Sequence, residues 1–131
     1  NVKKYKDTKF VFVFPPYSRM LYAQWKQYYQ LNYEIHKAII RYLAQKSSEY
    51  KNLKIYGFED NDFLDDIANY KDLSHYHQSI NSMMLNNFKN DIGLLTSDNV
   101  ENYIKISEEK ALNYNVFEIA DKISEYLKNN K

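Results

Sequence analysis

Asp72 and His75 are the two residues of this sequence whose types and spacing best fit catalysis. They stand three positions apart in the stretch NYKDLSHYHQ, residues 69–78, which also holds His77. In a turn, this spacing lets the carboxylate accept a hydrogen bond from Nδ1 of the histidine, which supports an imidazolium and leaves Nε2 free as a general base. His77 lies in reach of the same loop and is the alternative histidine. A hydrogen bond that only closes a turn and caps the next helix uses the same residues, so the pattern alone leaves both interpretations open.

The composition is that of one globular domain. The chain has 131 residues, of which 44% are hydrophobic and 27% charged, and its formal net charge is +1. No run of Lys and Arg suggests a nucleic-acid partner, and no apolar stretch approaches the roughly 20 residues of a membrane span. The absence of cysteine excludes disulfides, thiol catalysis and thiolate metal sites.

Two apolar runs flank a long helical pattern in the first half of the chain. Residues 8–18 are β-branched and aromatic until the two prolines, and such continuous apolarity is typical of a strand covered on both faces. Residues 52–60 form a second, shorter run. From Arg19 to about Lys46 the pattern predicts one helix. Its apolar stripe is Leu21, Trp25, Tyr28, Ile35, Ile39 and Tyr42. A strand, a helix and a strand in this order predict a βαβ unit with parallel strands.

The second half of the chain reads as a loop followed by helices. Residues 59–78 are polar and acid-rich, and three helical patterns come after them. These patterns are Ile80, Met83, Met84 and Phe88; then Val100, Tyr103, Ile104 and Leu112; then Val116, Ile119, Ala120, Ile123, Tyr126 and Leu127. The predicted fold class is therefore α/β and helix-rich, with a small parallel sheet followed by helices. Residues 1–131 are predicted to form a single domain or a domain fragment.

The order of these elements resembles the C-terminal part of the SGNH (GDSL-type) hydrolases. The resemblance covers residues 8–90 and rests on the element order and on D-x-x-H, here Asp72 and His75, the last conserved block of that superfamily. The stretch YKDLSHYHQSIN also looks like the version in bacterial cell-envelope proteins related to polysaccharide O-acetyltransferases and esterases. The resemblance implies a flavodoxin-like three-layer fold in the parent protein, with residues 91–131 as a C-terminal helical extension.

The resemblance also implies a Ser-His-Asp triad in which His75 is the general base and Asp72 its orienting partner. The nucleophile of the family lies in a G-D-S block after the first strand, and its oxyanion donors are a Gly and the Asn of a G-x-N block. This chain contains only Gly57 and Gly93, and neither belongs to such a block. The chain starts at Asn1 and reaches a strand-like run after only a few residues, so we expect the serine to lie upstream and this chain alone to be inactive.

The expected function is thus the C-terminal portion of an ester hydrolase or O-acyltransferase that acts on an acylated polysaccharide or another ester substrate. The family implies the bacterial periplasm or cell envelope, and any signal or membrane anchor would lie upstream. The alternative is a non-catalytic binding or assembly module that keeps the scaffold. No cofactor or metal is expected, and unpaired sheet edges predict self-association into a homo-oligomer.

Other polar residues have simpler interpretations. Ser18 follows a strand and precedes a helix like a nucleophile elbow, but it lacks the flanking glycines, so we interpret it as a helix cap. Ser74 is interpreted as a turn residue and His36 as a surface or packing residue. Four aspartates precede the histidine loop, but their spacing matches no metal-binding pattern, and a solvated acidic loop is expected. They are Asp60, Asp62, Asp65 and Asp66.

Overall fold

The computed structural model describes residues 1–130 and contains three strands, five α-helices and two short 3₁₀ helices within that range. The chain order is β1 (Phe10–Val13), α1 (Arg19–Tyr28), α2 (Gln30–Glu49), β2 (Leu53–Tyr56), η1 (Asp62–Asp65), η2 (Ile67–Asn69), α3 (Gln78–Lys89), β3 (Leu94–Leu95), α4 (Val100–Asn113) and α5 (Val116–Asn129). The predicted α/β, helix-rich class is confirmed.

The sheet has the order β1-β2-β3, with β2 in the centre. β1 and β2 are parallel neighbours, with Phe10 opposite Leu53 and Val13 opposite Tyr56, so the predicted βαβ unit is present. β3 is antiparallel to β2, which makes the sheet mixed rather than wholly parallel. β3 is not predictable from the sequence, because a strand of two residues is too short to show a period.

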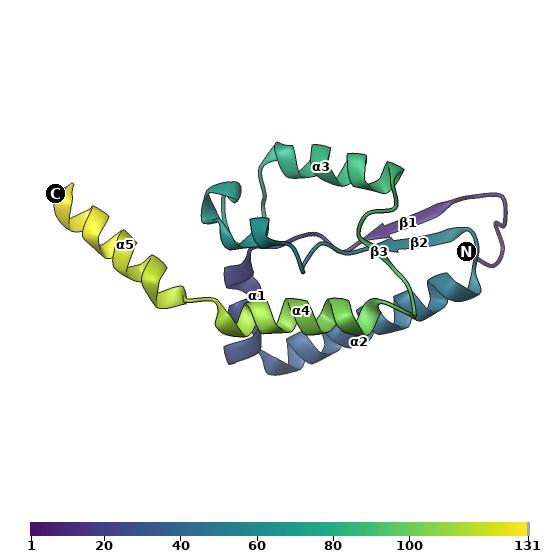
Figure 1. The fold of residues 1–131 in the computed structure, drawn as a ribbon, viewed down its shortest axis with the longest axis horizontal. Helices are drawn as coiled ribbons and strands as arrows, with labels where there is room; N and C mark the ends of the chain where they lie inside the picture. Colours follow the sequence, from purple (N-terminus) through teal and green to yellow (C-terminus); the bar gives the residue numbers. More distant parts are fainter. Residues whose placement is uncertain (131) are drawn as a thin grey trace.

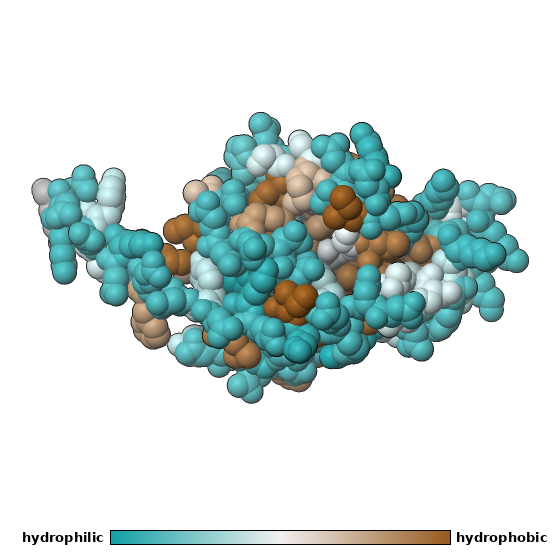
Figure 2. Space-filling model, viewed as in Figure 1, coloured by the Kyte–Doolittle hydropathy of each residue, from teal (hydrophilic) through white to brown (hydrophobic). Residues whose placement is uncertain are grey.

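Helices cover both faces of the sheet (Figure 1). α2 and α4 lie on one face and α3 lies on the other. The core cluster on the α2 and α4 side joins both helices to β2 and β3. Its buried members are Ile40, Ala44, Leu53, Ile55, Leu95, Val100, Tyr103 and Ile104. A second cluster, on the α3 side, contains Tyr56, Phe58, Ile80 and Met84. On the face in view in Figure 2, hydrophobic side chains remain visible between α3 and α4.

The prediction of one helix over residues 19–46 is wrong, because the helix breaks at Tyr29. Tyr29 has φ −128° and ψ 50°, which ends α1 and begins α2. The predicted apolar stripe is also wrong on α2, where Ile35, Ile39 and Tyr42 are exposed. The buried residues of α2 are instead Tyr33, Lys37, Ile40 and Ala44. Lys37 is tolerated there because its ammonium bonds to Glu34 and Glu108.

The three helices predicted after the loop are present, but they differ in their packing. α4 contributes to the core together with β3, so residues beyond 90 complete this domain. α5 extends away from the body (Figure 1), and none of its described residues is buried.

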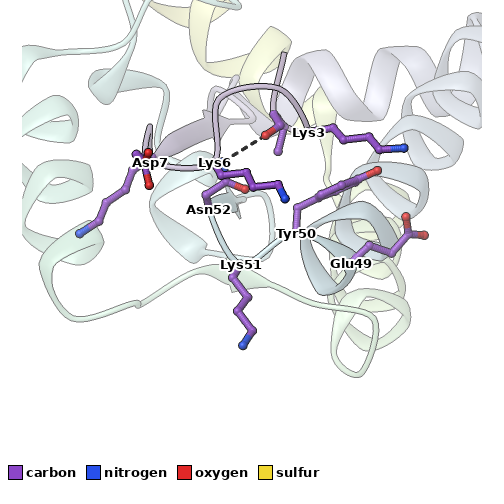
Figure 3. A pocket seen from close by; sticks show the side chains of 9 residues that line it. Lys3, Lys6, Asp7, Glu49, Tyr50, Lys51 and Asn52 are labelled. Carbon is purple, nitrogen blue, oxygen red and sulfur yellow. Dashed lines mark hydrogen bonds between the residues drawn. The ribbon is translucent and has the colours of Figure 1, made fainter.

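The segment before β1 folds against the turn that precedes β2. The side-chain amide of Asn52 donates hydrogen bonds to the carbonyl oxygens of Val2, Tyr5 and Thr8 at 3.0–3.2 Å. A cavity of about 440 Å³ lies between these two segments (Figure 3). Its lining residues are Val2, Lys3, Lys6, Asp7, Lys9, Glu49, Tyr50, Lys51 and Asn52. All of them precede a strand, so the cavity lies at the amino ends of β1 and β2, opposite the loop that carries Asp72 and His75.

Candidate catalytic pair in the loop after β2

Asp72 and His75 form the hydrogen bond that their spacing predicts. Nδ1 of His75 lies 2.7 Å from Oδ2 of Asp72 and 3.0 Å from Oδ1. Because the carboxylate can only accept, Nδ1 must carry a proton in this arrangement. Nε2 of His75 forms no hydrogen bond within the described residues. The ring is therefore oriented as a general base requires, with one nitrogen fixed and the other available.

Backbone amides hold the Asp72 carboxylate in place. Oδ1 accepts hydrogen bonds from the N–H groups of Ser74 and His75, both at 2.9 Å, and from the Ser74 hydroxyl at 3.1 Å. The pKa of Asp72 is held well below its usual range, first by the hydrogen bond from the Ser74 amide. The His75 amide and then the His75 ring lower it further. Asp72 is thus ionised across the physiological range and can stabilise a charged imidazolium. Ser74 acts as the turn residue that the sequence predicts.

The loop around the pair is closed by main-chain hydrogen bonds. Tyr70 and Tyr76 form an antiparallel bridge. The N–H of Lys71 donates to the His75 carbonyl at 2.8 Å, and the N–H of His77 donates to the Asn69 carbonyl at 2.7 Å. Both tyrosine side chains pack against the core cluster on the α3 side, which connects the exposed tip of the loop to the body of the domain.

The segment after β1 fixes the loop at the carboxyl end of the strands. The N–H and the hydroxyl of Ser18 both donate to the Leu73 carbonyl, at 3.0 and 2.9 Å. The hydroxyl of Tyr70 donates to the Pro16 carbonyl at 2.9 Å. Ser18 also caps α1, since its side chain accepts from the Leu21 N–H, and it is 2% exposed. These contacts support the interpretation of Ser18 as a cap.

His77, the alternative histidine, has a different environment. It is the N-cap of α3, and its Nδ1 accepts a hydrogen bond from the N–H of Ser79 at 3.2 Å. A hollow of about 470 Å³ lies beside it. Its lining residues are Ala68, Asn69, Tyr70, Lys71, Tyr76, His77 and Gln78. His77 caps a helix and makes no hydrogen bond to Asp72 within residues 1–130.

His75 projects into solvent rather than into a cleft. Its side chain is 76% exposed and that of Asp72 is 51% exposed. In a triad, Nε2 faces an open cleft, here expected at the carboxyl ends of the strands, because a serine must approach it. The imidazole lies at the carboxyl end of the strands, as expected. No cleft within residues 1–130 encloses it, since its side chain is 76% exposed. A substrate-binding surface at this position would need further protein atoms.

A buried polar network next to β2 was missed by sequence reasoning. Arg19 is fully buried, and its guanidinium donates to the carbonyls of Glu59 and Asn61 at 2.5 and 2.8 Å and to the Asp65 carboxylate at 2.7 Å. The Glu59 carboxyl, 3% exposed, lies 2.7 Å from Nε2 of His36. Nothing in the local spacing signals this network, because its partners are 23 to 46 positions apart.

His36 is a packing residue, as one of its two interpretations predicts. Its ring lies 5.6 Å from the rings of Phe14 and Trp25 and 5.9 Å from that of Tyr22, measured between centroids. Nδ1 of His36 forms no hydrogen bond within the described residues. Aromatic rings surround the imidazole, and its bond to Glu59 holds α2 against the loop after β2.

The four aspartates of the loop have separate partners. Asp62 pairs with Lys110, Asp65 pairs with Arg19, and Asp66 caps the second 3₁₀ helix by accepting from the Ala68 N–H. Asp60 accepts a hydrogen bond from the side-chain amide of Asn61 at 2.8 Å, and partial burial raises its pKa. Within residues 1–130, no group of three or more histidine, cysteine, aspartate or glutamate side chains is arranged to hold a metal ion.

None of the helices described in residues 1–130 combines the length and the apolar character that a membrane crossing requires.

Comparisons with other proteins assign no family or function to this chain. No protein-family model, no curated protein and no solved structure matches this chain.

Proposed function

We propose that this chain is the C-terminal portion of an SGNH-type ester hydrolase or O-acyltransferase of the bacterial cell envelope, with an acylated polysaccharide as substrate. In this proposal the chain forms the end of a flavodoxin-like three-layer domain and supplies Asp72 and His75 to a Ser-His-Asp triad. The serine comes from a segment outside these 131 residues. The observation that carries the proposal is the 2.7 Å hydrogen bond from Nδ1 of His75 to Asp72, with Nε2 left open to solvent.

The position of the pair supports this function. Catalytic groups in α/β sheets gather beyond the carboxyl ends of parallel strands. The loop of Asp72 and His75 lies there, held by Ser18 and Tyr70 against the segment that follows β1. The high exposure of His75 also fits a pair whose nucleophile and oxyanion donors come from another segment, because that segment would cover it.

The chemistry follows from the two nitrogens of His75. Nε2 accepts the proton of the serine hydroxyl as its oxygen attacks the ester carbonyl carbon, and the charged ring then protonates the departing sugar oxygen. The resulting acyl-serine is resolved by water in a hydrolase or by an acceptor hydroxyl in a transferase, with Nε2 again accepting the proton. Throughout, Asp72 stabilises the imidazolium and keeps Nδ1 as the donor.

The test uses the natural protein that contains this chain, assayed for release of acetate from acetylated polysaccharide and from small aryl acetates. His75→Ala and Asp72→Asn should each lower turnover by orders of magnitude with little change in thermal stability. His77→Ala is the matched control, since it removes a neighbouring histidine that makes no bond to Asp72, and it should leave turnover intact. Equal losses in all three variants, or none, would contradict the proposal.

A non-catalytic assembly module is the second candidate. It is favoured by the apolar side chains that α2 exposes, among them Leu31 at 72%, Ile35 at 51% and Tyr42 at 58%. The sequence of the gene upstream of the Asn1 codon separates the two candidates. A G-D-S block after a strand would support the enzyme, and a gene without such a block would support the module.

A further inference from the structure

The cavity at the amino ends of β1 and β2 gathers lysine side chains from two segments of the chain. Lys3, Lys6 and Lys9 belong to the segment before β1, and Lys51 belongs to the turn before β2. All four are exposed, and none of them forms an ion pair within residues 1–130. Seven other lysines in that range do pair with a carboxylate. The cavity thus collects positive charges that remain unpaired in the described part of the chain.

Two carboxylates, those of Asp7 and Glu49, also line the cavity, so its lysines outnumber its acidic side chains by four to two. Glu49 is already bonded through both of its oxygens to Lys46, at 2.8 Å. The cavity therefore carries a net positive charge, although the formal net charge of the whole chain is only +1. Charges of one sign that line a hollow concentrate their field and attract ions of the opposite sign. This charge pattern indicates an anionic ligand.

The floor of the cavity is apolar and is held in place by the core. Val2 and Tyr50 are partly buried and pack against the core cluster that joins α2 and α4 to the sheet. The side chains of Lys3 and Lys6 extend on the side of the Tyr50 ring, whereas Lys51 points away from it (Figure 3). Lys3 and Lys6 are therefore the two lysines positioned to bind a ligand that rests on this ring.

The main chain that carries these lysines is fixed by hydrogen bonds. The N–H groups of Lys4 and Tyr5 donate to the Asn1 carbonyl at 3.0 and 2.9 Å, which closes a turn. The side-chain amide of Asn52 bonds to three carbonyls of the same segment. These bonds hold the lysines near one another although like charges repel. A bound anion relieves that repulsion, which favours binding.

We propose that this cavity binds a small phosphate monoester of a ring compound, with the phosphate on Lys3 and Lys6 and the ring against Tyr50. A phosphate monoester carries a charge of about −1.5 to −2 at pH 7 and has three acceptor oxygens, so it can bind several ammonium groups at once. A carboxylate has a single charge and two oxygens, and it matches a cluster of lysines less well.

The size of the cavity also fits such a ligand. Its volume of about 440 Å³ lies within the range of small-molecule sites, which combine apolar walls with a few polar groups. A sugar phosphate and a mononucleotide share the required chemistry, and the test below distinguishes them. The proposal does not depend on the catalytic function, because the cavity lies at the end of the sheet opposite Asp72 and His75.

Isothermal titration calorimetry of the chain at low salt tests the proposal with four probes: glucose 6-phosphate, adenosine monophosphate, inorganic phosphate and glucose. At least one of the two esters should bind more tightly than inorganic phosphate, because only an ester also contacts the Tyr50 ring, and uncharged glucose should not bind. The ester that binds more tightly identifies the ligand as a sugar phosphate or a nucleotide. Raising the salt concentration to about 1 M should weaken the binding, because the Debye length falls to about 3 Å. Equal affinity for inorganic phosphate and both esters would show an adventitious ion only and would overturn the proposal.

Two double variants separate the site from the net charge. Lys3→Gln with Lys6→Gln should lower the affinity for the ester by about tenfold or more, because both ammonium contacts are lost. Lys89→Gln with Lys128→Gln is the matched control, since it removes the same charge from two exposed lysines of α3 and α5, and it should bind like the wild type. Tyr50→Leu keeps an apolar side chain against the core and should reduce the affinity for the ester to that for inorganic phosphate.

NMR spectra of the chain locate the binding site. Amide signals of residues 3–9 and 49–52 should shift during the titration with the ester, while those of residues 72–75 should stay in place. Circular dichroism verifies that the variants are folded. Equal losses of affinity in the two double variants, shifts confined to other residues, or no binding of either ester at millimolar concentration would overturn the proposal.

Discussion

Ser18 donates two hydrogen bonds to one acceptor, the carbonyl oxygen of Leu73, which lies 55 positions further along the chain. This contact joins the end of the first strand segment to the loop of the candidate catalytic pair. The Ser18 hydroxyl also accepts a hydrogen bond from the N–H of Leu21 in the first turn of α1. Ser18, whose place between a strand and a helix resembles that of a nucleophile, thus positions the loop of Asp72 and His75.

The first prediction concerns Ser18→Ala. The variant should lose about 1 kcal/mol of stability in urea denaturation, because the helix cap and the hydroxyl bond to the Leu73 carbonyl are lost while the bond from the backbone N–H to that carbonyl remains. NMR signals of residues 72–75 should shift, while Ser79→Ala, an exposed change at the start of α3, should leave them in place. The wild-type chain should not hydrolyse aryl acetates. Esterase activity that Ser18→Ala abolishes would make Ser18 the nucleophile and contradict the proposed function.

The second prediction concerns the protons on the two histidines of the loop. Neutral His75 should carry its proton on Nδ1, which donates to Asp72, whereas neutral His77 should carry it on Nε2, because its Nδ1 accepts from Ser79. Nitrogen-15 NMR of the imidazole rings distinguishes the two tautomers. In Asp72→Asn the preference at His75 should disappear while His77 stays unchanged, which provides an internal control. The same tautomer in both rings would refute the described geometry.

The third prediction concerns alkaline unfolding. Burial is the largest cause that raises the pKa of Tyr22 and Tyr103, and burial followed by the hydrogen bond to Asp91 raises the pKa of Tyr56 to about 12. The folded state therefore holds these protons more tightly than the unfolded state, whose tyrosines ionise near pH 10. This contribution to stability is fully present below about pH 10 and is lost as the pH rises towards 12.

Tyrosinate absorbance and circular dichroism, recorded together, check this prediction. The chain has 14 tyrosines. Some should ionise gradually without unfolding, and the remainder should ionise together with the loss of secondary structure. A single gradual titration of all tyrosines in a folded protein would show that the buried hydroxyls are accessible to solvent.

The fourth prediction compares two arginines. Arg19→Ala should lower the free energy of unfolding by about 3–5 kcal/mol, because it removes a fully buried side chain and leaves the carbonyls of Glu59 and Asn61 without their donor. Arg41→Ala removes an exposed pair with Glu101 and should cost less than about 1 kcal/mol. Urea denaturation of both variants measures the difference. Similar losses in the two variants would mean that the Arg19 network contributes no more than a surface pair.

The sequence predicts the elements that have a long apolar period and misses those that depend on distant partners. The βαβ unit follows from two apolar runs around a helical pattern, and the pair of Asp72 and His75 follows from a spacing of three. Both are local signals. The break between α1 and α2 at Tyr29 has no local signal, since neither glycine nor proline lies there.

On α2 the apolar pattern of the sequence predicts the exposed side of the helix as the buried one. The helix has two apolar flanks, and the flank with Ile35, Ile39 and Tyr42 has the more regular spacing. The buried flank contains His36 and Lys37, whose polarity suggests a surface. They are accommodated because Glu59 and Glu108 lie across from them, a fact that only the folded chain reveals.

The hydrogen bond between Asp72 and His75 and the contact between Ser18 and Leu73 also differ in when they can form during folding. The first closes a loop of three residues and can appear within a nearly unfolded chain. The second needs β1, the crossover helices and β2 in place, because closing a long loop carries a larger entropic cost. The pair therefore does not require the sheet, whereas its attachment to the segment after β1 does. Refolding rates of the site should follow the slow pairing of β1 with β2, whichever residues of the loop are changed.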